Sequence, residues 1–190
     1  MTSILKVDTI QDADGNNIIN ESGNTITIGA SGDTTNIIGT LQNDGAAVGG
    51  VNTPAFGAYQ SSNQSISNNT ETIITLDTEL YDTDNAFSSN TFTVPSNKSG
   101  KYFLYAQAGK SGWGANRMFI SIRKNDSVNL AQGEVTNTSS QYGVVNVSIL
   151  AQLAVGDTIV ARIYQDSGST QVLSGNSTRT FFYGYKTIGA

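Results

Sequence analysis

Four carboxylates that lie close together in the sequence are the residues best suited to chemistry in this chain. The densest acidic cluster consists of Asp77, Glu79, Asp82 and Asp84. A pair of carboxylates can hydrolyse a glycosidic bond, and a group of them can bind calcium. A solvated loop between two strands explains the same cluster without any ligand, and this is the interpretation that we favour.

Other reactive groups are missing from the sequence. The chain has no cysteine and no histidine, which excludes disulfides, thiolate nucleophiles, Cys/His zinc sites and mechanisms that need a histidine base. The segment 12–17 resembles a calcium loop superficially. An EF-hand, however, needs glycine at its sixth position and a carboxylate at its twelfth, where this chain has Asn17 and Gly23. We therefore assign no catalytic residue, no metal site and no cofactor, and expect a protein that is not an enzyme.

Binding residues are expected on loops, where such residues tend to lie. The single tryptophan, Trp113, lies in a glycine-flanked loop at 109–116. An exposed tryptophan stacks on sugar rings or anchors a protein contact, and a tryptophan that folds inward to hold its own loop is the alternative. Polar loops are also expected at 136–141 and 167–177. The candidate ligand or receptor residues are Trp113, Asn116, Thr136, Asn137, Ser139, Gln141 and Asn176.

The elements that must position these loops differ sharply on the two sides of residue 52. Every aromatic residue lies at or after Phe56, and the net charge of −5 belongs wholly to residues 1–52, where Lys6 is the only base against six carboxylates. We divide the chain into an arm, residues 1–52, and a knob, residues 53–190. An acidic chain without a basic stripe is not expected to bind nucleic acid. The first residues have no long apolar run, so we expect no signal peptide and no membrane insertion.

The arm repeats one short pattern, in which a glycine with Asn or Asp precedes a β-branched strand. The pattern occurs at 15–19, 23–28 and 32–38. Asp14-Gly15 also predicts a hairpin between 4–10 and 18–19. Roughly 50 residues without an aromatic cannot bury enough surface to offset their backbone entropy. The arm is therefore either disordered, or ordered by wrapping with identical chains or docking onto another protein. Its alternating Ile and Thr favour the second interpretation.

The knob shows period-2 alternation between turn residues, and no window has the 3.6-residue period of a helix. Strands are predicted at 55–59, 71–76, 90–94, 101–108, 117–123, 129–132, 144–153, 157–164 and 178–187. Strands at this spacing predict an all-β fold, a two-sheet sandwich with the jelly roll as the natural candidate, preceded by an extended β-rich arm.

The knob resembles the globular head of the first complement component, which shares the tumour-necrosis-factor-like jelly roll. The resemblance covers about residues 54–188 and is carried, in order, by Phe56, Phe87, 90–95 (NTFTVP), 100–105 (GKYFLY), 153–159 (LAVGDTI) and 180–185 (TFFYGY). The physical interpretation agrees with it. Gly100 and Gly156 lie where tight turns are needed, Pro95 ends the pairing of a strand, and Gly184 allows close packing beneath large rings.

The resemblance implies a homotrimer, because members of that family are trimers whose closing and central strands line the shared axis. The candidate interface residues are Tyr102, Tyr105, Phe181, Tyr183 and Tyr185. Alternation places Phe181, Tyr183 and Tyr185 on one face of a strand and Phe182 and Gly184 on the other. The sequence does not say which face is core and which is interface. The complement function does not transfer, since a secretory signal and a collagen stalk are missing, and calcium binding, which some such heads show, stays open.

The arm resembles the N-terminal arm of small structural proteins from tailed bacteriophages. The resemblance covers about residues 3–50 and is carried by the opening 5–10 (LKVDTI), by Gly15 and by the Gly-Asn repeats. It implies that the arm anchors the protein to tail or capsid proteins, with Ile4, Leu5, Val7 and Ile10 as the anchoring candidates.

Together these features predict a virion protein, a trimeric fibre or spike whose knob contacts a host surface glycan or protein. A head decoration or capsid fibre protein is one alternative, and a free carbohydrate-binding trimer is another. A depolymerase is the third alternative and fits least well, because no convincing acid pair is present.

Overall fold

The computed structural model describes residues 9–11, 13, 17–22, 25–28, 31–38, 42–43, 46–47, 52–110, 112, 116–137 and 143–188. The chain divides into two compact units, residues 1–50 and residues 51–190, and each is described by itself. Every regular secondary-structure element assigned in the described residues is a β-strand. Within this part of the chain, no helix is long and apolar enough to cross a membrane.

The first unit contains a three-stranded antiparallel sheet and a short hairpin. The sheet has the order β1-β2-β3, formed by β1 (Thr9–Gln11), β2 (Asn17–Ser22) and β3 (Thr25–Ile28). The hairpin pairs β4 (Gln42–Asn43) with β5 (Ala46–Ala47). Pairing of β1 with β2 confirms the predicted hairpin, and β2 and β3 confirm the first two repeats.

The third repeat, 32–38, does not form the strand that we predicted from its sequence. In β3, Ile26 and Ile28 alternate with threonine, so both isoleucines lie on one face. Ile37 and Ile38 are adjacent in the sequence and would point to opposite faces of a strand, so they build no shared apolar face.

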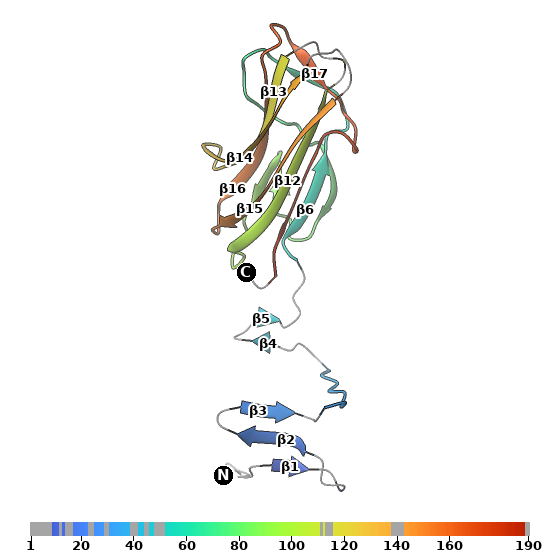
Figure 1. Cartoon of the computed structure of the whole chain (residues 1–190), viewed down its shortest axis with the longest axis vertical. Helices are drawn as coiled ribbons and strands as arrows, with labels where there is room; N and C mark the ends of the chain where they lie inside the picture. Colours follow the sequence, from blue (N-terminus) through green and yellow to red (C-terminus); the bar gives the residue numbers. More distant parts are fainter. Residues whose placement is uncertain are drawn as a thin grey trace. The chain divides into compact units, whose positions relative to one another are not determined.

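The second unit is a sandwich of two antiparallel sheets (Figure 1). The first sheet has the order β7-β17-β12-β18-β6-β9, with β15 paired to the other edge of β12. Its strands are β6 (Ala55–Tyr59), β7 (Gln64–Ile66), β9 (Thr78–Asp82), β12 (Gly100–Lys110), β15 (Gly143–Leu153), β17 (Gln171–Leu173) and β18 (Phe181–Lys186).

The second sheet has the order β10-β11-β16-β13-β14, with β8 beside β16. Its strands are β8 (Thr72–Ile73), β10 (Phe87–Ser88), β11 (Thr91–Thr93), β13 (Asn116–Lys124), β14 (Val128–Asn137) and β16 (Thr158–Gln165). This architecture confirms the predicted all-β sandwich.

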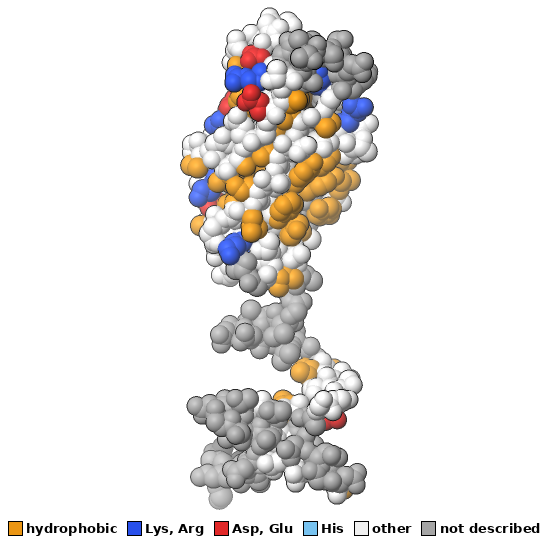
Figure 2. Space-filling view, viewed as in Figure 1, with side chains coloured by type: hydrophobic (Ala, Val, Ile, Leu, Met, Phe, Trp, Pro, Cys, Tyr) orange, Lys and Arg blue, Asp and Glu red, His pale blue; other side chains and the backbone are white. Residues whose placement is uncertain are grey.

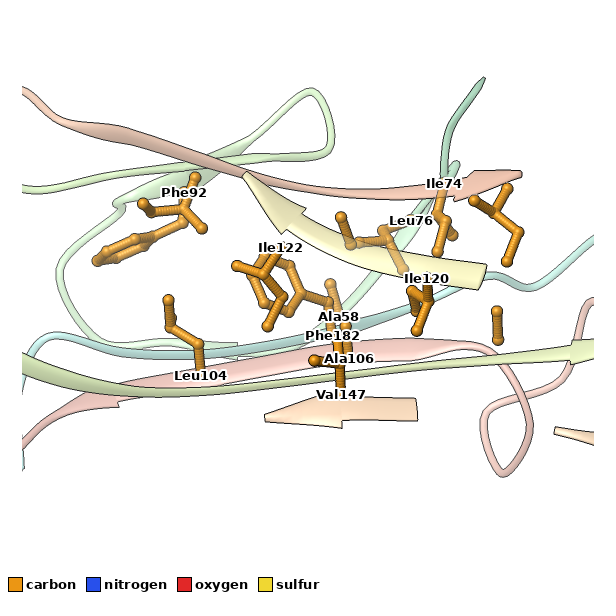
Figure 3. Close-up of a cluster of buried hydrophobic side chains, with 14 of the residues drawn as sticks. Ala58, Ile74, Leu76, Phe92, Leu104, Ala106, Ile120, Ile122, Val147 and Phe182 are labelled. Carbon is orange, nitrogen blue, oxygen red and sulfur yellow. The ribbon is translucent and has the colours of Figure 1, made fainter. Parts of the chain in front are cut away.

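The core lies between the two sheets and is built by strict alternation along each strand. Figure 3 shows Leu104, Ala106 and Phe182 from the first sheet facing Phe92, Ile120 and Ile122. These six side chains have no exposed surface. The burial of alternate residues explains why period-2 patterns predicted most of the strands correctly.

Two glycines that the sequence singled out have the expected structural roles. Gly156 has a φ of +83° in the turn before β16, a conformation that side chains with a Cβ rarely adopt. A Cβ on Gly184 would lie 2.6 Å from Phe56 Cε1 and 2.8 Å from Leu104 Cδ2. The prediction that Gly184 allows close packing beneath large rings is therefore confirmed.

Two residues of the acidic cluster lie on an edge strand and not in the predicted loop, whereas Asp77 and Asp84 lie just outside that strand. Glu79 and Asp82 belong to β9, which pairs with β6 through a register shift next to Gly57. Charged residues suit an edge strand, because they discourage pairing with another chain. Leu80 and Tyr81 of β9 are adjacent and both exposed, so the strand shows no apolar alternation and its sequence pattern resembled that of a loop.

Candidate functional site

The outer surface of the first sheet carries a row of aromatic side chains along β18. Phe182 and Gly184 are buried toward the core, whereas Phe181 and Tyr183 are half-buried and Tyr185 is exposed. The alternation inferred from the sequence is confirmed. The burial of Phe182 and Gly184 also shows which face of the strand is the core. Phe181, Tyr183 and Tyr185 must therefore point away from the core.

Register brings three further rings to the same surface. Tyr105 lies opposite Tyr183 and Phe103 lies opposite Tyr185 across the β12–β18 pair. Tyr81 of β9 lies opposite Gly57, which is itself opposite Tyr183. We call this surface the aromatic face and define it by Tyr81, Phe103, Tyr105, Phe181, Tyr183 and Tyr185.

The rings of the aromatic face pack against one another. Phe181 stacks on Tyr183 with 4.6 Å between ring centroids, and Tyr105 stacks on Phe181 at 5.6 Å. Tyr81 lies 6.4 Å from Tyr183, and Phe103 lies 5.5 Å from Tyr185. Stacked rings at these separations favour each other beyond their area burial. Because the rings support each other, the surface is ordered within a single chain.

Gly57 has no side chain, which lets the rings of Tyr81 and Tyr183 lie directly over the backbone of β6. A Cβ at this position would lie 2.7 Å from Tyr81 Cε1 and 2.9 Å from Tyr183 Cδ1. The backbone of β6 therefore forms a shallow floor beneath the two tyrosines. A larger residue here would have to displace one of the rings.

The aromatic face carries no charge across its central rows. Three cross-strand rows of the first sheet run Ala55–Tyr185–Phe103–Leu150, Gly57–Tyr183–Tyr105–Ser148 and Tyr59–Phe181–Gln107–Asn146. None of these residues is charged. Figure 2 shows hydrophobic side chains gathered over β12 and β6, with charged side chains nearer the margins.

Partial burial already affects the phenols in a single chain. Burial raises the pKa of Tyr81, and burial together with the nearby Tyr81 raises the pKa of Tyr183. Yet Tyr81, Tyr185 and Leu150 remain exposed. A contiguous, uncharged surface of this kind is typical of a protein–protein contact.

Tyr102 does not belong to the aromatic face, and its assignment as an interface candidate is corrected. Its side chain is fully buried among core residues, and its hydroxyl donates a 2.6 Å hydrogen bond to the carbonyl oxygen of Lys98. Burial, with a further contribution from the charge of Asp84, raises the pKa of Tyr102 to about 12. Tyr102 therefore stabilises the interior of its own subunit.

The outer surface of the second sheet has a different composition. It carries arginines that are paired within the chain: Arg123 with Glu71 at 2.6 Å, Arg162 with Asp126 at 2.6 Å and Arg117 with Asp166 at 3.2 Å. We call this surface the arginine face. Its two rings, Phe119 and Tyr164, stack at 4.7 Å beneath Arg117. The pKa of Arg117 is raised, and its hydrogen bond with Tyr164 is the main cause.

The described residues within and beside the candidate binding loops lie at one end of the sandwich. Trp113, Ser139 and Gln141 lie outside the described residues. Asn116 and Asn137 are directly paired where β13 begins and β14 ends, and Thr136 beside them is exposed.

Asn176 lies at the same end, near the end of β12, because the amide of Ser174 donates to the carbonyl of Gly109. The Oδ1 atom of Asn176 accepts hydrogen bonds from the amide and hydroxyl of Thr178. Its side chain therefore shapes its own loop.

Three of the four carboxylates of the acidic cluster, Asp77, Asp82 and Asp84, each make their own local contacts. Asp77 accepts hydrogen bonds from the amide and hydroxyl of Ser61. Asp82 accepts from the amide of Phe87, and Asp84 lies 3.5 Å from the Nζ atom of Lys98. In the described residues, no group of three or more acidic side chains is arranged to hold a metal ion.

The anchoring candidates of the arm are described only in part. Ile10 lies on β1 with its side chain exposed. Ile4, Leu5 and Val7 lie outside the described residues.

Three members of this outer surface were not predicted from the sequence: Phe103, Tyr81 and Leu150. Alternation along 101–108 would have separated Tyr102 from Phe103 and Tyr105, just as it separated the residues of β18. No local pattern marks Tyr81, because only the pairing of β9 with β6 brings it to this surface.

Comparison with known proteins gives the fold of the knob. No protein-family model matches the sequence, and a search of the curated proteins finds no match. Among solved structures, the globular domain of a zebrafish complement 1qA protein is 18% identical, with a TM-score of 0.54 over 72% of this chain and 98% of that one. Murine APRIL is 16% identical, with a TM-score of 0.56 over 70% and 98%. Eiger TNF from S. frugiperda is 12% identical, with a TM-score of 0.51 over 72% and 93%.

These similarities confirm the jelly roll that was expected from the order of motifs in the knob. The identities are low, so the similarity extends to the fold and does not identify a ligand. Each matched structure is covered almost completely, and in every case about three tenths of this chain lies outside the match.

Proposed function

We propose that this chain is a homotrimeric virion protein of a tailed bacteriophage, a fibre or spike whose knob contacts the host surface. The observation that carries the trimeric part of this proposal is the aromatic face, which is uncharged and only partly buried in a single chain. Such a surface gains free energy when another surface removes it from water.

A second and third copy of the same chain are the partners that fit this face best. The surface presents no charge that a neighbour would have to neutralise, so identical faces can pack without repulsion. The family that the knob resembles forms trimers through its closing and central strands. In this chain those strands are β18 and β12, which carry five of the six residues of the aromatic face.

The candidate binding loops suit a role in adhesion. Their described residues lie at the end of the sandwich where β12 ends. The knob begins at the other end, where the amide of Lys186 donates to the carbonyl of Pro54 and the amide of Thr187 donates to the carbonyl of Lys101. A trimer would present three copies of these loops together. Weak contacts to a host glycan or protein would then gain strength from multivalency.

The location in a virion rests on the arm. Its opening, 5–10, and its Gly-Asn repeats resemble the anchoring arms of phage structural proteins. The arm would attach to tail or capsid proteins and leave the knob free. A head decoration protein would use the same parts with the knob merely covering the capsid.

The oligomeric state tests the central part of this proposal. Light scattering of the full chain is expected to give about three times the chain mass of 20.0 kDa. Leu150→Asp places a charge at the margin of the aromatic face and is expected to dissociate the oligomer. Val128→Asp, on the edge strand of the second sheet, is the matched control, because the two side chains are exposed to 57% and 49%. A monomeric parent chain, or equal behaviour of the two variants, would contradict the proposal.

Particle incorporation tests the location. A chain that lacks residues 1–50 keeps the complete knob unit and is expected to stay soluble but to be missing from phage particles. Electron microscopy of particles that carry labelled full-length protein would separate a tail position from a head position. Incorporation of the truncated chain would refute the anchoring role of the arm, and glycan binding by a protein found in no particle would favour a free carbohydrate-binding trimer.

A further inference from the structure

The three-stranded sheet of the arm carries a row of isoleucines on one face. Register places Ile10 opposite Ile19 and Ile19 opposite Ile28, one residue from each strand. Ile26 is two residues from Ile28 and therefore lies on the same face. All four side chains are exposed, between 37% for Ile19 and 68% for Ile26.

A sheet of this size needs a partner for its apolar face. Small sheets gain independent stability only when a hydrophobic face is covered. Among the arm side chains whose burial the structure describes, none is a buried hydrophobic residue, and all the described core residues lie in the knob unit. The isoleucine row, defined as Ile10, Ile19, Ile26 and Ile28, is thus an apolar surface that the single chain leaves uncovered.

The chain connectivity indicates what covers it. A short linking segment joins the arm to β6. β6 lies inside the sheet that carries the aromatic face, with Ala55 in the same cross-strand row as Tyr185 and Phe103. If knobs associate through that face, each arm starts from the associating sheet itself. The linking residues between β5 and β6 are few, so the arms of one oligomer are held at a high effective concentration.

The chemistry of the row also favours identical partners. It consists of one β-branched aliphatic residue type repeated across three strands, and such side chains pack well on pleated surfaces. Register also places Glu21 opposite Ile26 on the same face of the sheet, so copies that pack through the row must leave this carboxylate at the hydrated margin of the contact.

We propose that the isoleucine row packs against the same row in the other copies of the oligomer, so that the arms form a shared apolar core of their own. This inference rests on the proposed function for the presence of several arms in one assembly. It assigns a partner to a surface that the aromatic face does not involve.

Thiol cross-linking of the full chain tests the proposal, because the native sequence has no cysteine. Ile19→Cys puts one thiol in the centre of the row. Thr9→Cys, an exposed position next to Ile10 whose side chain lies on the opposite face, is the matched control. With a short bifunctional maleimide, Ile19→Cys is expected to form covalent links between copies at least tenfold faster than Thr9→Cys, at a rate independent of protein concentration.

The mass of each variant separates failure of this inference from failure of the proposed function. An oligomer in which both thiols cross-link at equal rates would overturn the isoleucine contact and leave the aromatic contact standing. A monomer without cross-links would overturn both.

A second measurement uses a charge in place of the thiol. Ile19→Asp is expected to speed proteolysis of residues 1–50 at least tenfold while the oligomer, held by its knobs, keeps its mass. Thr9→Asp is expected to leave the proteolysis rate within a factor of two of the parent. Equal proteolysis of the parent and Ile19→Asp would also overturn the isoleucine contact.

Discussion

The two outer surfaces of the knob come from sheets with the same alternation, yet they carry different chemistry. On the arginine face, Arg123, Arg162 and Arg117 each have a carboxylate partner in the same chain. On the aromatic face, uncharged rings contact one another and leave apolar surface exposed. The charges of the arginine face are therefore paired within the chain and can face water. The apolar side chains of the aromatic face are only partly buried by their own chain.

The difference shows how a sandwich can direct association to one sheet. Paired charges on the arginine face remain hydrated, and burying them against a partner would cost desolvation energy. Removing water from the uncharged rings of the aromatic face has no comparable desolvation cost. Even the aromatic residues follow this rule, since Phe119 and Tyr164 lie beneath Arg117 and do not form an open apolar surface.

The largest expected effect comes from placing a charge in the centre of one surface or the other. Tyr183→Asp puts a carboxylate between Tyr81 and Tyr105, where association would bury it without a partner. We expect association to weaken at least a hundredfold, on the order of 3–5 kcal/mol. Tyr164→Asp on the arginine face introduces the same change beside Arg117 and should leave the mass unaltered. Sedimentation velocity over a concentration series measures both, and equal dissociation of the two variants would remove the distinction between the surfaces.

A smaller change in stability is expected when a methyl group is added at two crowded glycines that face opposite sides of the first sheet. Gly184→Ala drives a Cβ into Phe56 and Leu104 in the core, which should lower the free energy of unfolding by about 1–3 kcal/mol. At Gly57 the obstructing atoms are the ring edges of Tyr81 and Tyr183, which can move outward in a single chain. Gly57→Ala should therefore cost under about 1 kcal/mol of stability and mainly weaken association. Urea denaturation of both variants in a monomeric background provides the measurement, and a larger loss for Gly57→Ala would contradict this order.

Acid should weaken the arginine face by a still smaller amount. Two hydrogen bonds of 2.6 Å from Arg162 lower the pKa of Asp126 below its ordinary value of 3.8. A carboxylate whose pKa is lowered by folding stabilises the fold above the unfolded pKa, and this stability is lost as the pH falls through the lowered value. The Asp126 side chain is half exposed, so the loss should be small and should shrink further in high salt.

Asp126→Asn is the variant that isolates this contribution. Asp157 also has a lowered pKa, chiefly because the amide of Ala154 donates to it, so the parent will retain other acid sensitivity. We expect the stability difference between parent and Asp126→Asn to vanish at the acid end of a denaturation series. A difference that does not change with pH would argue that Asp126 contributes through packing alone.

The smallest effect is spectroscopic and concerns the tyrosines of the first sheet. Tyr102, with its pKa raised to about 12, should ionise later than ordinary tyrosines when absorbance is followed at alkaline pH. Because folding raises this pKa, the stability that it contributes is complete below the ordinary value of 10.0 and is lost as the pH rises through the folded value. Tyr102→Phe should remove the last step.

Tyr183 makes the same titration sensitive to association. Its pKa is already raised in one chain, and a neighbouring subunit would bury it further. We expect the dissociated Leu150→Asp variant to ionise Tyr183 at a lower pH than the parent. An unchanged titration would show that the aromatic face stays exposed to water.

Alternation in the sequence was sufficient to predict the sandwich and the residues that share a face along β18. Ala55–Tyr59 was predicted with its observed bounds, whereas 71–76 shortened to Thr72–Ile73. The acidic cluster was assigned to a loop because an edge strand with one solvated side has no clear apolar period. Local patterns predict a strand best where both the core and the neighbouring strands require it.

The sequence by itself determined that the chain has an aromatic-free acidic arm and an all-β knob without cysteine or histidine. It also determined which residues of a strand lie together, because alternate side chains must point to the same side. Only the tertiary structure decided that Phe181, Tyr183 and Tyr185 face outward, that Tyr102 is buried and that Tyr81 joins the aromatic face. The physical reason is that period 2 sorts residues into two faces, whereas contacts between strands distant in sequence decide which face becomes the core.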